Sequence, residues 1–203
     1  GAEDTAIVYD YWWDTRNRKA YVFNPSNSTS KPKVLYDRNY QDIYSDPGSF
    51  LKTRNTFNKS VLMLYKGNAY LRGAGFSKEG QFPFIDKLNI TTLNKSRVYQ
   101  SKYTDKVEAI QDYNPSNNEL IVRIESPTEY PNYYSKKTNG KKLSKITDFE
   151  NPFKELQNVK KEVITYKRDD GLELSGILYL PVNYDEEKKE KAPMILWAYP
   201  REF

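Results

Sequence analysis

Short runs in which apolar and polar residues alternate recur along most of the chain, with clusters of Asn, Asp, Pro, Ser and Gly between them. A period of two is typical of strands that cover a core on one face. Apolar spacing of the helical kind is hard to find anywhere. The pattern predicts strands at residues 6–12, 19–23, 34–37, 60–65, 69–72, 82–90, 96–100, 107–112, 120–125, 132–137 and 141–147.

Turn-forming residues join these predicted strands into hairpins. Residues 14–18 and 66–68 are polar turns between neighbouring runs, and Asn139-Gly140 is a dipeptide that favours a tight hairpin. In Asp46-Pro47-Gly48, Pro fixes φ and Gly tolerates the left-handed region. The chain is therefore predicted to be mainly β, with antiparallel neighbours close in sequence.

The strands group into about three units of roughly 40 to 50 residues each, which is the spacing of β-propeller blades. The repeat is one of pattern, since the units share little sequence. A β-sandwich also has short strands at regular spacing. Pattern alone leaves the propeller and the sandwich about equally favoured.

The character of the sequence changes near residue 151. Two strand-like runs, 162–168 and 172–181, flank Asp169-Asp170-Gly171, which predicts a hairpin. After a charged loop, residues 194–199 form a nearly continuous apolar run. Such runs suit a strand that is buried on both faces, so a sheet of another kind is predicted to begin here.

Composition restricts the chemistry. The 203 residues include no histidine and no cysteine, so the chain cannot hold a complete His-based catalytic triad, a disulfide or a Cys-ligated zinc. The net charge is +5, but the lysines are scattered among acidic residues, which favours a solvated surface over a nucleic-acid partner. No stretch approaches the roughly 20 apolar residues that span a bilayer, so no membrane partner is predicted.

Other candidate motifs have simpler interpretations. Residues 73–77 begin like a phosphate-binding glycine loop but follow a hairpin instead of opening a helix, so a loop or bulge is predicted. Asp46, Asp148, Asp169 and Asp170 are interpreted as turn residues, because Asp bonds to nearby backbone there. We predict no metal site and no cofactor.

Residues 163–200 resemble the opening of the catalytic domain in the prolyl oligopeptidase family of serine peptidases. The similarity lies in Asp170-Gly171-Leu172-Glu173-Leu174-Ser175-Gly176-Ile177-Leu178-Tyr179-Leu180-Pro181 and in Pro193-Met194-Ile195-Leu196-Trp197-Ala198-Tyr199-Pro200. Upstream, residues 44–49, 83–86 and 146–152 resemble the glutamyl endopeptidase-like or dipeptidyl aminopeptidase-like branch. Tyr199-Pro200-Arg201-Glu202-Phe203 is similar to a motif of the same branch.

The resemblance implies a fold and favours propeller over sandwich. Residues 1–157 would be the C-terminal blades of a β-propeller, about three in number. Residues 158–203 would be the first strands of an α/β-hydrolase domain. The Ser, Asp and His of the family's triad would lie beyond Tyr199, so this polypeptide alone is predicted to be inactive. The alternative is a non-catalytic β-propeller or β-sandwich that binds peptides or glycans.

The resemblance also implies site residues. Tyr199 would donate its hydroxyl to the oxyanion of the acyl-transfer transition state. Arg201 and Glu202, on the following loop, could contact substrate, although a solvated charge pair is equally favoured. The expected partners are a peptide substrate and the remainder of the hydrolase domain. Open sheet edges predict a homo-oligomer through edge strands. The family suggests a periplasmic or secreted location, with a cytoplasmic one as the alternative. Because the chain does not start with Met, a removed leader fits the sequence.

Overall fold

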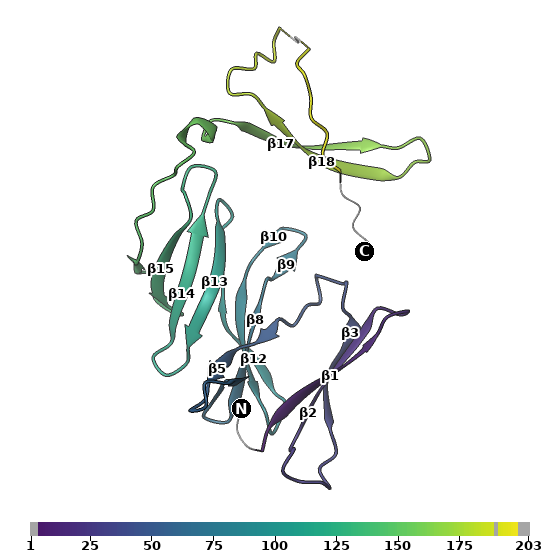
Figure 1. Ribbon diagram of the computed structural model, residues 1–203, viewed down its shortest axis with the longest axis vertical. Helices are drawn as coiled ribbons and strands as arrows, with labels where there is room; N and C mark the ends of the chain where they lie inside the picture. The colour runs from purple at the N-terminus through teal and green to yellow at the C-terminus, as the bar shows by residue number, and fades with distance from the viewer. Residues whose placement is uncertain (1–3, 189–190, 199–203) are drawn as a thin grey trace. The chain divides into compact units, whose positions relative to one another are not determined.

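A computed structural model of the chain describes residues 4–188 and 191–198 (Figure 1). These residues are mainly strand, and the only helical segment among them is the 3₁₀ turn η1, Lys154–Leu156. No helix in this part of the chain is long and apolar enough to cross a membrane. The chain divides into two compact units, one up to Phe149 and one from Glu150 onward. The structure thus confirms the mainly β class.

The first sheet of the N-terminal unit is an antiparallel meander. It consists of β1 (Ala6–Trp12), β2 (Asn17–Phe23) and β3 (Lys33–Asn39), in that order. The predicted first hairpin is confirmed, with Tyr11 opposite Arg18 and Tyr9 opposite Ala20. A bulge in the pairing of β2 with β3 shifts the register after Ala20.

The second sheet has the strand order β12-β11-β8-β4, with β7 also paired to β8. Two short ribbons, β5 with β6 and β9 with β10, lie in the connections of this region. The bounds are β4 Ser49–Phe50, β5 Lys52–Arg54, β6 Ser60–Leu62, β7 Leu64–Tyr65, β8 Asn68–Gly73, β9 Phe76–Ser77, β10 Gly80–Gln81, β11 Phe84–Asn89 and β12 Lys95–Gln100.

One predicted strand of this sheet is divided. The run 60–65 was expected to be continuous, but it splits at Met63, whose N–H donates to the Leu51 carbonyl at 3.0 Å. Residues before Met63 pair with β5 and those after it pair with β8. The two halves therefore serve different partners, which alternation alone does not reveal.

The third sheet is a four-stranded antiparallel meander in sequence order. It contains β13 (Val107–Asn114), β14 (Glu119–Glu125), β15 (Asn132–Lys137) and β16 (Leu143–Lys145). All four strands were predicted from the pattern. A bulge at Gln111 interrupts the pairing of β13 with β14.

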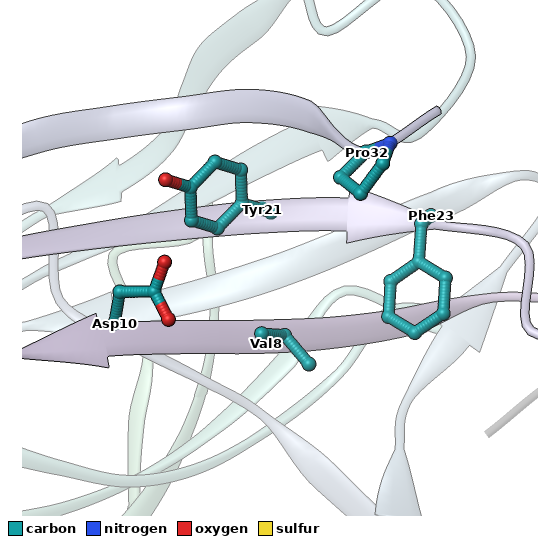
Figure 2. Close-up of a pocket in the computed structure, with 5 residues that line it drawn as sticks. All are labelled: Val8, Asp10, Tyr21, Phe23 and Pro32. Atoms are coloured by element: carbon teal, nitrogen blue, oxygen red, sulfur yellow. The ribbon is translucent and has the colours of Figure 1, made fainter. Parts of the chain in front are cut away.

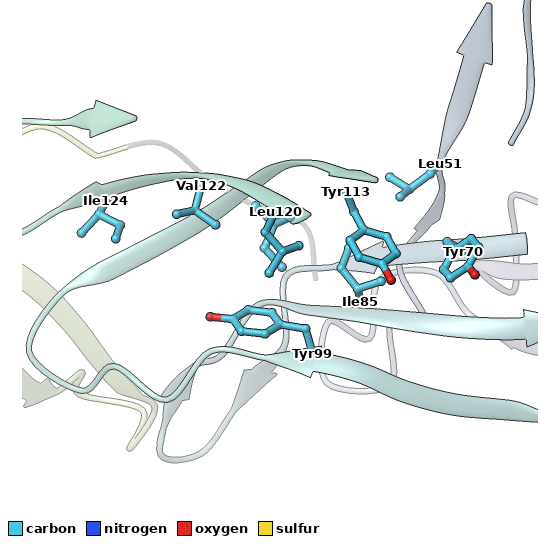
Figure 3. Packing of buried hydrophobic residues seen from close by; sticks show 9 residues of the cluster. Leu51, Tyr70, Ile85, Tyr99, Tyr113, Leu120, Val122 and Ile124 are labelled. Carbon is cyan, nitrogen blue, oxygen red and sulfur yellow. The ribbon is translucent and has the colours of Figure 1, made fainter. Parts of the chain in front are cut away.

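A hydrophobic cluster joins the second and third sheets (Figure 3). Tyr70, Ile85 and Tyr99 come from the second sheet, while Leu120 and Val122 come from β14. Ile85, Leu120 and Val122 have no exposed surface. Alternate residues of β14 are buried, so this strand covers the core with one face.

A second cluster joins the second sheet to the first. Ala69 and Leu71 of β8 pack with Leu88 of β11, and Ile7 of β1 and Leu35 of β3 lie against them. Successive residues of β8 therefore serve different clusters, since Tyr70 belongs to the other one. The second sheet is covered on both faces, which explains the nearly continuous burial of its central strands β8 and β11.

In the described part of the C-terminal unit, β17 (Lys160–Lys167) and β18 (Glu173–Leu180) form a hairpin. It turns at Gly171, whose φ of +86° a glycine adopts without strain, and the predicted hairpin is confirmed. Many of its apolar side chains are exposed, including Val163 at 75% and Ile177 at 61%.

The buried strand predicted at 194–199 is not found in its described part, and Tyr199 lies outside the described residues. Residues 194–198 form no strand, and Met194, Ile195, Leu196 and Trp197 are all at least 75% exposed. A strand of a parallel sheet needs neighbours on both edges and cover on both faces. None of the described residues supplies them, so this part of the prediction is wrong for the structure of this chain.

Candidate functional site

The site residues predicted from the sequence are Tyr199, Arg201 and Glu202. All three lie outside the described residues, so the structure does not place them. Their roles remain predictions.

The acidic residues considered earlier act locally. Asp46 Oδ1 accepts the Gly48 N–H at 2.9 Å, and Asp170 Oδ1 accepts the Leu172 N–H at 3.2 Å. Asp148 forms an ion pair with Lys145. No group of three or more potential metal ligands occurs among residues 4–188 and 191–198.

The glycine loop at 73–77 is also structural. Gly75 has φ +67°, and a Cβ there would lie 1.9 Å from the carbonyl oxygen of Phe82. The Phe82 N–H in turn donates to the Gly75 carbonyl at 2.8 Å. Glycine is thus required by a close backbone approach, and this loop leads into the β9–β10 ribbon.

The most distinctive polar cluster lies on the first sheet and is called here the arginine–tyrosine cluster. It consists of Arg18, Tyr9, Tyr11 and Tyr36. The guanidinium carbon of Arg18 is 5.7 Å from the Tyr9 and Tyr11 ring centres and 5.5 Å from that of Tyr36. Arg18 Nη1 donates to the Tyr11 hydroxyl at 3.3 Å. A cation therefore sits among three aromatic rings.

The sheet register builds this cluster. Tyr11 lies opposite Arg18 across the β1–β2 hairpin, and Tyr9 lies two residues along β1 on the same face. Tyr36 of β3 pairs with Ala20, which shares that face of β2. Three adjacent strands thus bring the four side chains together.

Burial keeps two tyrosines of this cluster, Tyr9 and Tyr36, protonated. Burial raises the pKa of Tyr9 to about 12, and it also raises the pKa of Tyr36. Their hydroxyls are hydrogen-bond donors at neutral pH. The buried Nε of Arg18 has no hydrogen-bond partner among the described residues. The cluster therefore holds a positive charge and an unused donor.

The opposite face of the same hairpin carries a shallow pocket of about 280 Å³ (Figure 2). Val8 and Asp10 of β1 line it with Tyr21 and Phe23 of β2, and Pro32 closes one end. Asp10 is the only acidic side chain among the described residues of this lining. The pocket is mainly apolar, and its described lining offers few polar groups that could orient a ligand.

A buried polar network links the second and third sheets. The Tyr99 hydroxyl donates to Glu108 Oε2 at 2.5 Å, and Lys136 Nζ donates to Glu108 Oε1 at 3.2 Å and to the Tyr99 hydroxyl at 2.8 Å. The side chain of Glu108 has no exposed surface and that of Lys136 is 11% exposed. Burial, followed by the bond to Glu108, raises the pKa of Tyr99 far above its usual value. The buried carboxylate is fully paired, so we assign this network to holding the sheets together.

Other polar side chains that join the strands are also paired. Arg72 donates to the Ile110 and Gln111 carbonyls at 3.0 and 2.5 Å, and so ties β8 to the bulge of β13. Buried Asp86 accepts from Arg97 at 2.5 Å. Asn132 Oδ1 accepts from the Phe149 N–H at 2.7 Å and fixes the chain leaving β16. These contacts stabilise the scaffold.

Reasoning from the sequence singled out neither the arginine–tyrosine cluster nor the buried network. The signal for the cluster was present, because Tyr9 and Tyr11 alternate on the first strand and Arg18 follows a short turn. A register assigned to that hairpin would have placed Arg18 beside Tyr11. The network joins residues far apart in sequence, and no local pattern indicates it.

Two curated plant proteins are similar to nearly the whole chain. Both are named "Probable glutamyl endopeptidase, chloroplastic". The protein from Oryza sativa subsp. japonica is 36% identical and the one from Arabidopsis thaliana 34% identical, each over 99% of this chain. The chain spans 23% of the length of each.

Among solved structures, the AtxE2 isopeptidase with astexin3-dC4 bound matches with a TM-score of 0.47 at 11% identity, over 91% of this chain and 25% of that one. Its apo form matches with a TM-score of 0.44 at 12% identity, over 90% and 25%. No family model matches the chain. The names of the plant relatives indicate that the chain is related to peptidases.

Proposed function

We propose that this chain is part of a serine peptidase of the prolyl oligopeptidase family that cleaves short peptides. The observation that carries the proposal is the sequence identity of 36% and 34% with two proteins named glutamyl endopeptidase, over 99% of the chain. The motifs between Asp170 and Pro200 support the same family. The chain spans 23% of the length of those relatives. The catalytic residues would therefore lie in a part of the whole protein that corresponds to the remaining length of the relatives.

The three consecutive antiparallel sheets would be neighbouring blades of a β-propeller. Support comes from their sequential meander order and from the two clusters that join the second sheet to both others. The hairpin of β17 and β18 would open the α/β-hydrolase domain, with 157/158 as the boundary. Its exposed apolar side chains would then be covered by the rest of that domain.

The chemistry would be acyl transfer through a Ser-His-Asp triad. The chain has no histidine, so the base would come from outside it. Tyr199 would donate a hydrogen bond to the oxyanion, a contribution of about 3 kcal/mol to transition-state stabilisation when such a donor is preorganised. Arg201 and Glu202 would border the substrate.

The propeller would restrict access to the active site and admit small peptides. This polypeptide alone would be inactive, and its open sheet edges would favour edge-to-edge association. A periplasmic or secreted location is proposed for the whole protein, on the family resemblance alone.

The test compares this chain with a version extended to the length of the plant relatives. Both are incubated with a capped glutamyl fluorogenic peptide and with a fluorophosphonate probe for reactive serines. We expect the extended protein to hydrolyse the peptide and to be labelled, and the 203-residue chain to do neither. Labelling of the short chain, or an inert extended chain that is correctly folded, would contradict the proposal.

A Tyr199→Phe substitution in the extended protein tests the residue role. Loss of one oxyanion donor should lower kcat by about a hundredfold with little change in KM. Arg168→Gln, in the exposed β17–β18 turn, is the matched control and should leave kcat unchanged. An unchanged kcat in Tyr199→Phe would remove the oxyanion role.

A further inference from the structure

We propose that the arginine–tyrosine cluster of the first sheet binds a carboxylate, specifically the acidic side chain of a peptide. The inference deepens the proposed function and rests on it for the choice of a peptide as ligand. The binding chemistry itself rests on Arg18, Tyr9, Tyr11 and Tyr36.

Arg18 differs from the other described arginines in its partners. Arg97, Arg123 and Arg168 donate to carboxylates. The others donate to backbone carbonyls: Arg16 to Trp13, Arg38 to Asp42, Arg54 to Asn58, and Arg72 to Ile110 and Gln111. Among residues 4–188 and 191–198, Arg18 donates only to a phenol hydroxyl, and its buried Nε has no hydrogen-bond partner. The guanidinium therefore has donor capacity that no described acceptor of the chain uses, and an acceptor on a ligand can satisfy its accessible part.

A carboxylate fits the unused groups. The guanidinium is a planar fork whose adjacent N–H groups match two carboxylate oxygens. The hydroxyls of Tyr9 and Tyr36 stay protonated at neutral pH and can donate further bonds. The aromatic rings lower the local polarity, which strengthens a charge-assisted bond.

The cluster is accessible from solvent. Tyr11 is 60% exposed and Tyr9 is 39% exposed, while Arg18 is half-buried. Tyr9, Tyr11 and part of the Arg18 side chain are therefore within reach of a ligand in solvent, whereas the Arg18 Nε is buried. Tyrosine and arginine are also the residues most enriched where peptides and proteins bind tightly.

The acidic residue that acts electrostatically on Arg18 is Asp46. In the described part of the chain Asp46 forms no ion pair with Arg18, and its Oδ1 accepts the Gly48 N–H. It is exposed, so its attraction for Arg18 is screened. Asp46 therefore competes weakly with a ligand carboxylate, and removing its charge should tighten binding.

The test measures binding to the 203-residue chain by calorimetry and by NMR of the tyrosine rings. The probes are the capped peptide Ac-Ala-Ala-Glu-Ala-Ala-NH2, the same peptide with Gln, and the Gln peptide with a free C-terminal carboxylate. We expect the Glu peptide to bind at least tenfold tighter than the capped Gln peptide. Tighter binding of the free C-terminal form would instead assign the site to chain ends, and inorganic phosphate that displaces the Glu peptide would assign it to general anions. Either result would overturn the side-chain assignment.

Variants test the residues. Arg18→Gln should weaken binding of the Glu peptide at least tenfold, Arg18→Lys by a smaller factor, and Asp46→Asn should strengthen it about threefold. Arg123→Gln, on β14 and paired with Glu125, is the control and should not change binding. Equal affinity of Arg18→Gln and the wild type would refute the proposal. Near-UV circular dichroism establishes that each variant folds, and Tyr36→Phe replaces Arg18→Gln if the latter does not.

Failure of this proposal is distinguishable from failure of the proposed function. The peptide titration needs no catalysis and uses this chain alone. If the extended protein is inactive but the short chain still prefers the Glu peptide, the proposed peptidase function is wrong and the carboxylate site is supported. If the extended protein is an active peptidase and its Arg18→Gln variant binds and cleaves normally, the peptidase function is supported and the carboxylate site is wrong.

Discussion

Strands β8 and β18 are both rich in apolar residues, yet they end in opposite environments. Ala69, Tyr70 and Leu71 of β8 are at most 5% exposed, whereas Ile177 and Tyr179 of β18 are 61% and 58% exposed. Both strands form regular antiparallel ladders. The difference lies in what covers them. The first sheet and the third sheet pack against the two faces of the β8 sheet, but no described segment covers β18 in that way.

This contrast separates ladder formation from burial. A hairpin forms from local signals, namely strand-forming residues and a turn such as the one at Gly171. Burial needs segments from elsewhere in the chain, and a lone two-stranded hairpin is marginally stable in water. The unit up to Phe149 therefore has its own core, whereas we expect the hairpin after Glu150 to need cover for its stability.

The largest effect should come from truncating the shared core. Leu71→Ala removes a side chain that is 2% exposed, so we expect a loss of about 3 kcal/mol in the free energy of unfolding. Ile177→Ala on β18 is the matched control and should cost less than about 0.5 kcal/mol, because the side chain is 61% exposed. Urea titration followed by tyrosine fluorescence measures both. Similar losses of unfolding free energy in the two variants would contradict the contrast between a buried β8 and an exposed β18.

A comparable effect is expected at the buried network. Lys136→Met leaves the fully buried Glu108 carboxylate without its cation and should cost about 3 kcal/mol. The double variant Glu108→Gln with Lys136→Met should regain at least half of that loss, since the uncompensated charge is gone. The same urea titration applies, and simple additivity of the two substitutions would contradict this account.

Two glycines with the same φ of +86° offer a finer comparison. A Cβ at Gly48 would lie 2.5 Å from the Arg72 carbonyl oxygen, whereas nothing lies within 4 Å of one at Gly171. Gly48→Ala should therefore cost about 2 kcal/mol or more, against about 1 kcal/mol of local hairpin stability for Gly171→Ala. Thermal unfolding reports the first and amide exchange of β17 and β18 reports the second. A Gly48→Ala protein as stable as wild type would show that the turn can shift.

The smallest effect concerns alkaline pH. Burial raises the pKa of Tyr113 to about 12, whereas an unfolded tyrosine titrates near about 10. Above that pH the unfolded state loses a proton that the folded state keeps, so stability present at neutral pH falls as pH rises. By about pH 11 this one group should remove about 1 kcal/mol. Unfolding measured from pH 8 to 11 should show a shallower decline in Tyr113→Phe, and an unchanged slope would contradict the shift.

The sequence predicted the local features well and the distant contacts poorly. Hairpins such as β1–β2 and β17–β18 follow from alternation and turn residues, which act within a few positions. The division at Met63 was missed, because it depends on Leu51 pairing from another strand. The exposed state of residues 194–198 was missed because burial was inferred from hydrophobicity alone. The cluster around Arg18 depends on the residue pairing between β1 and β2, which the alternation of apolar and polar residues alone does not specify.

Hydrogen exchange in two proteins tests the central claim most directly. Amide exchange is followed by mass spectrometry in the 203-residue chain and in the version extended to the length of the plant relatives. We expect β8, β11 and β14 to be strongly protected in both, and β17 and β18 to exchange quickly in the short chain but slowly in the extended one. Strong protection of β17 and β18 in the short chain, or fast exchange of them in the extended protein, would contradict the account.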